Sequence, residues 1–508
     1  MAQPKYPLLY QVNTRVWLTD LSREPGRPAT LDDIPDASIQ QLSEKGFTWL
    51  YMLSVWTTGD AARQISRGHA GWGREFRETL ADLSESDIGG SGFAIKSYQV
   101  HPDLGGDEAL KRFRERIRQY GLKLMLDFVP NHMAPDHAWV EQHPDYFIQG
   151  TAEELKNNPR NFTLLGQNAA SSVFAYGRDP YFDGWPDTLQ LNYSNAAVTD
   201  AMTHELKRIS TQCDGLRCDM AMLLMPAVFE KTWDRKMKSF WPEAIKEVKE
   251  KIPDFTFMAE VYWDMEWDLQ QVGFDYTYDK CLYDRLLAGY ARPVREHFYA
   301  ALEYQDKLAR FLENHDETRA ATSIELGKHE AAAVITYLSP GLKFFHQGQL
   351  EGKKHKISPH LVRGPKEPVN NFLAKFYTNL LAVLKMPVFR NGSFRIIEPL
   401  PAWEGNGSND SFLAFGWTGN DNREVLVCVN YASFTGQCRL HLPFPNLAGS
   451  SWVLQDQFST SSYTRNGDEL LEHGLFLDMP AWHYQVFELS RTGNSTISIK
   501  EDNPILQA

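Results

Sequence analysis

The chain has 508 residues, of which 43% are hydrophobic and 23% are charged, an ordinary composition for a globular protein with a large core. Its 52 basic and 65 acidic residues give a formal net charge of −13, which argues against nucleic acid or an anionic membrane as the main partner. Aromatic residues reach 13%, which suits sugar-stacking surfaces and large cores alike. Length alone predicts two to four domains.

Targeting and redox signals indicate a cytoplasmic protein. The N-terminus has no long apolar run after a basic start, and no stretch reaches the apolar length of a membrane span, so we expect neither a signal peptide nor a membrane partner. The cysteines are scattered, odd in number and not in metal-ligand spacing, so we expect reduced thiols and no metal site. They are Cys213, Cys218, Cys281, Cys428 and Cys438.

Apolar runs alternate with helical periodicity over about the first 350 residues. This pattern predicts a (β/α)8 TIM barrel. Residues 57–92, rich in Gly, Ser and charge, are expected to form a long loop, and 133–192 an irregular insertion after the third strand. Strands are expected at 8–18, 48–55, 122–129, 214–219, 255–261, 273–278, 308–314 and 342–346. Helices are expected at 32–45, 107–120, 195–211 and within 226–251.

After about residue 395 the helical periodicity fades. Short alternating runs with Gly, Asn and Pro turns predict a C-terminal antiparallel β-sandwich domain, with strands at 412–417, 424–430, 436–442, 451–456 and 482–489. We therefore expect a catalytic barrel (1–132 and 193–395), an inserted domain (133–192), a C-terminal β domain (396–490) and a polar tail (491–508).

Four of the predicted barrel strands end in or near an acidic residue. These residues are Asp127, Asp219, Glu260 and Asp316. Any one of them alone is explained as a cap for the following helix. Because barrel active sites lie at the carboxyl ends of the strands, and unpaired acids are costly in a core, four acids at one mouth predict an active site.

The spacing of Arg217 and Asp219 suggests how such a site works. Residues two apart in a strand point to the same face, so Arg217 is expected to keep the Asp219 carboxylate ionised and oriented, as a nucleophile must be. A purely structural ion pair is the alternative. Glu260 ends an apolar run, where a raised pKa keeps a carboxyl protonated for acid catalysis. Asp316 is expected to face sugar hydroxyls, and His132 and His315 either donate to them or are structural.

Four short motifs then appear in order along the chain, at residues 127–132, 215–221, 259–261 and 313–317. With these motifs the chain resembles the α-amylase-type retaining glycoside hydrolases. The resemblance implies that Asp219 is the nucleophile, Glu260 the acid/base and Asp316 the transition-state stabiliser. It implies a sugar subsite formed by Asp127, His132, Arg217 and His315, with Phe93 and Tyr98 in a segment similar to the family's Gly-Tyr segment.

Some positions depart from the family pattern. Phe93 replaces the usual Tyr, which keeps the stacking surface and loses a hydroxyl. Met222 and Leu223 stand where many starch-cleaving members have Lys-His, which argues against the family's bound calcium and against ordinary α-amylase specificity. Asn131 matches one calcium-ligand position, so calcium stays an alternative to the expectation that no cofactor is required. The basic segment Lys353–Lys356 predicts a solvated loop or a site for a phosphorylated sugar acceptor.

The residues and the resemblance together favour a retaining α-glycosidase that cleaves α-glucosidic bonds in α-glucans or oligosaccharides through a covalent glycosyl–enzyme intermediate. A transglycosidase that moves glucosyl or maltosyl units to a sugar or sugar-phosphate acceptor is the first alternative. A non-catalytic carbohydrate-binding or transporter-associated protein on the same fold is the second. The expected partner is a carbohydrate, and the sequence carries no prediction of oligomeric state.

Overall fold

A computed structural model describes residues 4–22, 26–166 and 172–492. The chain divides into two compact units. The first comprises Met1–Leu287, Ala300–His329 and Pro340–Leu381. The second comprises Ala288–Tyr299, Glu330–Ser339 and Ala382–Ala508.

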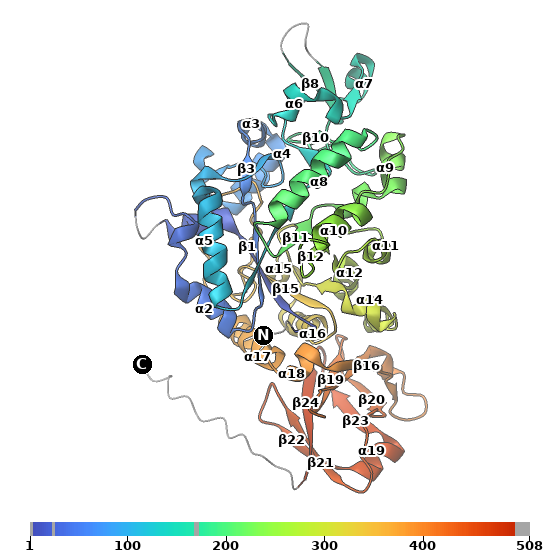
Figure 1. Ribbon diagram of the computed structural model, residues 1–508. Helices are drawn as coiled ribbons and strands as arrows, with labels where there is room; N and C mark the ends of the chain where they lie inside the picture. The colour runs from blue at the N-terminus through green and yellow to red at the C-terminus, as the bar shows by residue number, and fades with distance from the viewer. Residues whose placement is uncertain (1–3, 23–25, 167–171, 493–508) are drawn as a thin grey trace. The chain divides into compact units, whose positions relative to one another are not determined.

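A closed barrel of parallel strands forms the centre of the first unit, as Figure 1 shows around β1, β11, β12 and β15. Counted over the described residues, the barrel has eight strands, and each pairs with its neighbours in parallel register. This confirms the predicted (β/α)8 fold. In chain order the strands are β1 (Leu8–Asn13), β2 (Trp49–Leu53), β5 (Lys123–Phe128), β11 (Gly215–Cys218), β12 (Thr256–Ala259), β13 (Tyr276–Tyr278), β14 (Leu308–Arg310) and β15 (Leu342–His346).

Helices surround this barrel, and α5 (Gly106–Gln119) illustrates why they form where they do. Its acidic residues lie in the first turn and its basic residues in the last, which suits the helix dipole, and Gly121 follows with a φ of +77°. One face buries Ala109, Leu110, Phe113 and Ile117. Further helices of this unit are α2 (Asp36–Glu44), α8 (Ala196–Ser210), α9 (Pro226–Trp233), α10 (Trp241–Lys249) and α11 (Glu266–Gln271).

Two expectations about the N-terminal part of the chain were wrong. The first strand ends at Asn13 rather than 18, because the Asn13 side chain accepts from the Val16 N–H and caps α1 (Thr14–Leu21). Residues 57–92 are not a loop. They contain α3 (Asp60–Gly68) and α4 (Ala70–Thr79), preceded by β3 (Trp56–Thr58), which pairs with β4 (Ile95–Val100).

The insertion after the third barrel strand consists of short elements. Strand β6 (His132–Met133) leaves the barrel and β10 (Leu189–Gln190) pairs with it on the return, so the insertion is closed at its base. Between them, among the described residues, β7 (Gln149–Gly150), β9 (Ser172–Ala175) and β8 (Phe162–Leu165) form a small antiparallel sheet. Two short helices, α6 (Trp139–Gln142) and α7 (Ala152–Asn157), complete the insertion.

The second unit contains the antiparallel β domain that was predicted for the C-terminal part of the chain. Its two described sheets share one apolar core that includes Phe412, Leu426, Leu440 and Leu477. One sheet orders β16 (Ser393–Ile397), β18 (Phe412–Thr418), β19 (Glu424–Asn430), β24 (Tyr484–Arg491), β21 (Ser451–Asp456) and β22 (Ser462–Asn466). The other orders β17 (Leu400–Pro401), β20 (Gly436–Leu440) and β23 (Leu475–Met479).

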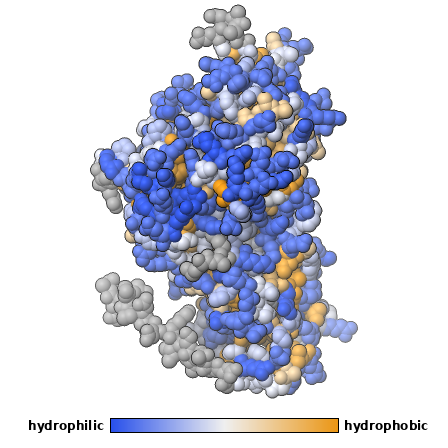
Figure 2. All heavy atoms as spheres, in the orientation of Figure 1, coloured by the Kyte–Doolittle hydropathy of each residue, from blue (hydrophilic) through white to orange (hydrophobic). Residues whose placement is uncertain are grey.

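The predicted division at 132/133, 192/193 and 395/396 stays a prediction. Of the expected polar tail, residues 493–508 lie outside the described part. None of the described helices combines the length and apolar character that a membrane span needs. The face drawn in Figure 2 is predominantly hydrophilic, with apolar side chains in small separate groups.

Candidate active site

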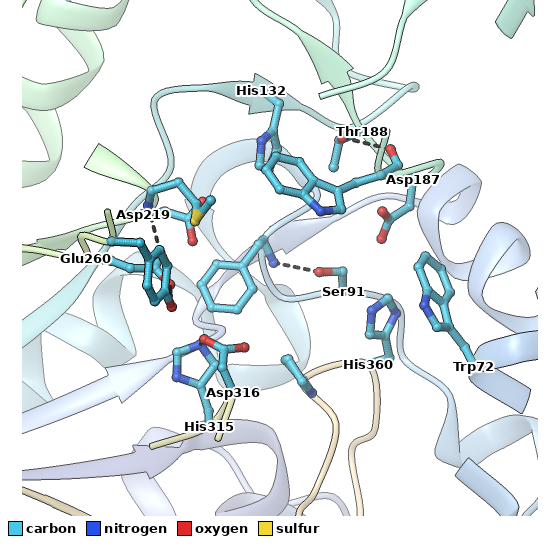
Figure 3. A pocket seen from close by; sticks show the side chains of 15 residues that line it. Trp72, Ser91, His132, Asp187, Thr188, Asp219, Glu260, His315, Asp316 and His360 are labelled. Atoms are coloured by element: carbon cyan, nitrogen blue, oxygen red, sulfur yellow. Dashed lines mark hydrogen bonds and ion pairs between the residues drawn. The ribbon is translucent and has the colours of Figure 1, made fainter. Parts of the chain in front are cut away.

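A pocket of about 290 Å³ opens at the carboxyl ends of the barrel strands. The predicted catalytic residues Asp219, Glu260 and Asp316 all line it, together with Phe93, His132 and His315 of the predicted substrate-binding set. The other lining residues are Trp72, Ser91, Trp185, Asp187, Thr188, Met220, Tyr262, Pro359 and His360. Figure 3 shows that Asp219, Glu260 and Asp316 approach the same space from different segments.

The guanidinium of Arg217 organises the acids from beneath. It is 0% exposed, and its Nη1 donates to Asp219 Oδ1 at 2.7 Å while its Nη2 lies 2.8 Å from Glu260 Oε2. Strand register places Arg217 directly beside Asp127, whose Oδ1 is 3.6 Å from Nη1. One rigid, always charged group therefore fixes carboxyls that belong to three neighbouring strands.

Burial separates the proton affinities of the two central carboxyls. The pKa of Asp219 is raised to about 6 by burial, and the positive charge of Arg217 opposes this rise. Burial raises the pKa of Glu260 further, to about 8, with the Asp219 and Asp316 carboxyls adding to the rise. At neutral pH Asp219 is thus mainly ionised and Glu260 mainly protonated, although Arg217 contacts both.

Hydrogen bonds fix the Glu260 carboxyl in place. The Met220 N–H donates to Oε2 at 2.7 Å, and the Tyr262 hydroxyl donates to Oε1 at 2.9 Å. Met220 follows Asp219 at the end of β11 and has a φ of +43°, an unusual conformation for a residue with a side chain. In this conformation its N–H points to Glu260.

Asp316 and His315 form the opposite wall, after β14. The Asn314 side chain accepts from the N–H groups of Asp316 and Glu317, which turns the segment. The Gln11 amide nitrogen is 2.9 Å from His315 Nδ1, and since an amide nitrogen can only donate, His315 carries its proton on Nε2, 3.0 Å from Asp316 Oδ2. Burial lowers the pKa of His315 to about 4, so the ring is neutral.

Aromatic surfaces complete the sugar-sized space. The Phe93 ring stacks on the His315 ring with 5.2 Å between centroids, and the Arg217 guanidinium lies 5.2 Å from the centre of the Phe93 ring. On the insertion side the His132 ring lies 5.3 Å from Trp185. Burial lowers the pKa of His132 to about 4, so it too faces the pocket as a neutral group.

Three of the predicted substrate-binding residues do not line the pocket. Tyr98 is buried, and its hydroxyl donates to the Val129 carbonyl and accepts from the Val129 N–H, so it supports the backbone beside β5. Asp127 and Arg217 lie under the pocket floor, where Asp127 accepts from the Tyr51 hydroxyl at 2.6 Å. The contacts that the structure shows for these three side chains are with protein groups.

The structure adds lining residues that the sequence did not reveal, among them Trp72, Asp187 and His360. Trp72 belongs to α4, inside the stretch expected to be a loop. Asp187 lies in the insertion, where no periodicity marks any side chain as inward. The tripeptide Trp185-Pro186-Asp187, an aromatic residue and an acid at a turn, was the available signal.

Asn131, which matches one calcium-ligand position of the family, is hydrogen-bonded to Gln190. Its side-chain nitrogen donates to Gln190 Oε1 at 3.1 Å, and its side-chain oxygen accepts from Gln190 Nε2 at 3.0 Å. Both ends of this amide are therefore engaged within the protein. Within the described ranges, no group of three or more His, Cys, Asp or Glu residues is arranged to hold a metal ion.

Fold and site together define a TIM barrel with a carboxyl-lined pocket of the glycosidase type. The family model described as the alpha-amylase catalytic domain matches residues 81–366, and the chain belongs to this family of glycoside hydrolases. Among solved structures, the α-amylase of Geobacillus thermoleovorans complexed with acarbose aligns with a TM-score of 0.65 at 18% identity. That alignment covers 97% of this chain and 100% of the other, and it shows a common fold.

Sequence relatives include both hydrolases and transferases. Alpha-amylase 3 of Dictyoglomus thermophilum is 24% identical over 304 residues, which are 55% of this chain and 57% of that protein. The alpha-1,4-glucan:maltose-1-phosphate maltosyltransferase of Pseudomonas aeruginosa is 29% identical over 178 residues, 32% of this chain and 24% of that enzyme. The chain thus spans little more than half of the first relative and about a quarter of the second.

Proposed function

We propose that the chain is a retaining α-glycosidase that cleaves α-glucosidic bonds in α-glucans or oligosaccharides through a covalent glycosyl–enzyme intermediate. One observation carries this proposal: a single buried guanidinium contacts both Asp219 and Glu260 while their environments give the two carboxyls different pKa values. Held so closely, the pair suits the retaining separation of about 5–5.5 Å rather than the about 6.5–9.5 Å of inverting enzymes.

Each carboxyl has a defined task in this reaction. Asp219 attacks the anomeric carbon as the bond to the departing oxygen breaks, and Glu260 gives its proton to that oxygen. In the second step Glu260, now a carboxylate, takes a proton from water or a sugar hydroxyl whose oxygen displaces Asp219. Asp316 and the neutral His315, which lie 3.0 Å apart, would bind sugar hydroxyls through hydrogen bonds that strengthen as the ring becomes oxocarbenium-like.

Transfer to a sugar or sugar-phosphate acceptor is the second candidate. The maltosyltransferase among the sequence relatives favours it, as does the basic segment Lys353–Lys356 beside the site. There Lys356 Nζ donates to the Asp316 carbonyl at 2.5 Å, while the His355 ring lies 3.1 Å from Glu367. This segment is therefore folded against the catalytic wall. Hydrolysis and transfer share every step up to the attack on the intermediate.

A non-catalytic carbohydrate-binding role is disfavoured, because burying several carboxyls and one guanidinium costs stability that a binding module has no need to lose. We further propose that the partner is a neutral carbohydrate, with no nucleic acid or membrane partner, that no calcium is required, and that the protein is cytoplasmic. The net charge of −13 supports the statement on partners, and the engaged Asn131 amide supports the statement on calcium.

Product analysis tests the function. The protein is incubated with maltooligosaccharides, soluble starch or sucrose, with and without glucose 1-phosphate or glycerol, and the products are resolved over time. Shorter sugars alone identify a hydrolase, and longer chains or new conjugates identify a transferase. Absence of any bond cleavage in folded protein would contradict both readings and favour the binding role.

Glu260→Gln sharpens this test, because the variant cannot protonate the departing oxygen. We expect cleavage of maltooligosaccharides to fall by at least about 100-fold, whereas an aryl α-glucoside with a good leaving group loses far less. Glu266→Gln, a change at a buried carboxyl that does not line the pocket, is the matched control. Equal losses on both substrates would contradict the acid/base role.

A further inference from the structure

Asp187 is a carboxyl in the pocket wall that the proposed reaction leaves unused. It lines the same pocket as the proposed catalytic acids, and the residue is 3% exposed. Its Oδ2 atom is buried with no hydrogen-bond partner among the described residues, and none of the described ion pairs includes it. Burial raises its pKa to about 7.

Such a group is costly in an apo protein, because a buried carboxylate oxygen without a donor loses its hydration and receives nothing in exchange. The backbone around it is nevertheless fixed. The Thr188 N–H and hydroxyl both bind the Trp185 carbonyl, and Thr188 Oγ1 accepts from the Gly177 N–H. The insertion therefore holds Asp187 in this position. A bound molecule that supplies hydroxyl donors would satisfy Oδ2.

The position of Asp187 separates it from the reacting acids. In Figure 3, Asp219 and Glu260 lie at one end of the pocket, and Asp187, Trp72 and His360 lie at the other. The Trp72 and His360 rings are 4.4 Å apart between centroids, and the Ser66 hydroxyl lies 2.8 Å from His360 Nδ1. The far end thus combines an aromatic surface with one hydrogen-bond acceptor, the combination that a sugar ring with several hydroxyls requires.

The position of Glu260 determines how a glycosyl donor is oriented in the pocket. Glu260 must stand beside the departing oxygen, so the departing sugar leaves on the Glu260 side. The end remote from Glu260 then lies beyond the sugar that Asp219 attacks, on the transferred side. A second sugar unit of the transferred part would reach Asp187 and Trp72.

We propose that Asp187 binds hydroxyl groups of a second sugar unit on the transferred side, so that the preferred donor delivers a disaccharide of the maltosyl type rather than a single glucosyl unit. This inference rests on the proposed function for its orientation. Trp72 provides the stacking surface for that second unit. The Asp187 carboxyl provides a hydrogen-bond acceptor, so the site favours a ring that bears hydroxyl groups over an apolar group.

Two donors with the same leaving group test this assignment. They are 4-nitrophenyl α-maltoside and 4-nitrophenyl α-glucoside, which differ only in the second unit. We expect the wild-type protein to prefer the maltoside in kcat/KM by at least about tenfold, the effect of one hydrogen bond to a charged group. Asp187→Ala should abolish this preference by slowing the maltoside alone, with the glucoside changed less than about twofold.

Asp183→Ala is the matched control, since Asp183 lies in the same insertion, is exposed and does not line the pocket. Equal losses on both donors in Asp187→Ala, or no loss on either, would overturn the assignment. Asp187→Asn keeps the side-chain volume and removes the carboxylate acceptor, so it should show the same selective loss.

A binding measurement separates this proposal from the proposed function. Calorimetric titration with maltose and with glucose needs no turnover, so it applies even if neither donor is cleaved, a result that would refute the glycosidase function alone. We expect maltose to bind Asp187→Ala at least about tenfold more weakly than it binds the wild-type and Asp183→Ala proteins. Equal maltose affinity in all three proteins would overturn the role of Asp187.

Discussion

Asp219 and Glu260 contact the same guanidinium, yet their pKa values of about 6 and about 8 lie on opposite sides of neutrality. A catalyst that needs an ionised Asp219 and a protonated Glu260 gains activity as pH rises through about 6 and loses it as pH rises through about 8. We expect a bell-shaped kcat/KM profile for a maltooligosaccharide between pH 4.5 and 9.5. Because the two carboxyls interact, the apparent pKa values of the two limbs belong to the pair and not to either residue alone.

The control for this profile is far-UV circular dichroism over the same range, which shows whether the protein stays folded on both limbs. Loss of the alkaline limb in Glu260→Gln, with the acidic limb kept, would support the assignment. A wild-type profile that is flat from pH 5 to 9 would contradict it.

At the residue scale the sequence pointed to the three acids that line the pocket, but not to the residues around them. Asp219 and Glu260 were predictable because each follows a short buried strand, where an acid is unusual. Tyr98 illustrates the limit: its position in the chain is close to Phe93, but its hydroxyl points to the Val129 backbone. Asp187 was missed, because burial within an insertion leaves no periodic pattern and the short segment Trp185-Pro186-Asp187 was the available signal for it.

The segment before Phe93 shows how tightly an element positions a site residue. A Cβ added at Gly92 would lie 2.6 Å from the Ser54 Cβ and 3.2 Å from its Cα, in the loop after β2. We expect Gly92→Ala to displace Phe93, to cost about 1–3 kcal/mol of stability by overpacking, and to lower kcat/KM by about tenfold or more. Thermal unfolding and kinetics on a maltooligosaccharide measure the two effects.

Gly73→Ala is the control for that change. Gly73 lies within α4, where the nearest atoms to an added Cβ would be those of the Arg77 guanidinium, at 3.6 Å or more. Alanine there should stabilise the protein by about 0.5–1 kcal/mol and leave kcat/KM unchanged. Wild-type activity and stability in Gly92→Ala would contradict the close packing behind Phe93.

Among the elements, the barrel strands were predictable because they are short apolar runs between turns, and β15 was predicted with the correct ends. Helices α3 and α4 were missed. Helix α4 buries Phe76 and otherwise carries mainly polar residues, so it has little apolar periodicity. Strand β22 was missed for a similar reason, since its side chains are mostly exposed and its ladder to β21 is not visible in sequence.

For the whole molecule, the alternation of apolar runs and helices along the chain was the strongest indication of the fold. Eight apolar runs separated by helices admit few topologies, because parallel strands need crossovers of one hand, and closing them into a barrel places every strand end at one mouth. The same reasoning could not place the insertion. Its strands pair with one another and close at β6 and β10 through contacts that no repeat or period announces.

The net charge of the whole chain leads to a last expectation, about salt. A protein with a formal net charge of −13 repels anions over a distance that shrinks to about 10 Å at 0.1 M salt, whereas a neutral sugar experiences no such force. If the donor is a neutral glucan, kcat/KM for maltotetraose should change less than about twofold between 0.02 and 0.5 M NaCl. Sodium sulfate at matched ionic strength controls for specific chloride effects.

A rate that rises severalfold with salt would mean that an anionic sugar is the true donor, because salt then screens its repulsion by the protein. A rate that falls steeply would mean that the basic segment at Lys353–Lys356 outweighs the charge of the whole molecule and attracts such a donor to the pocket.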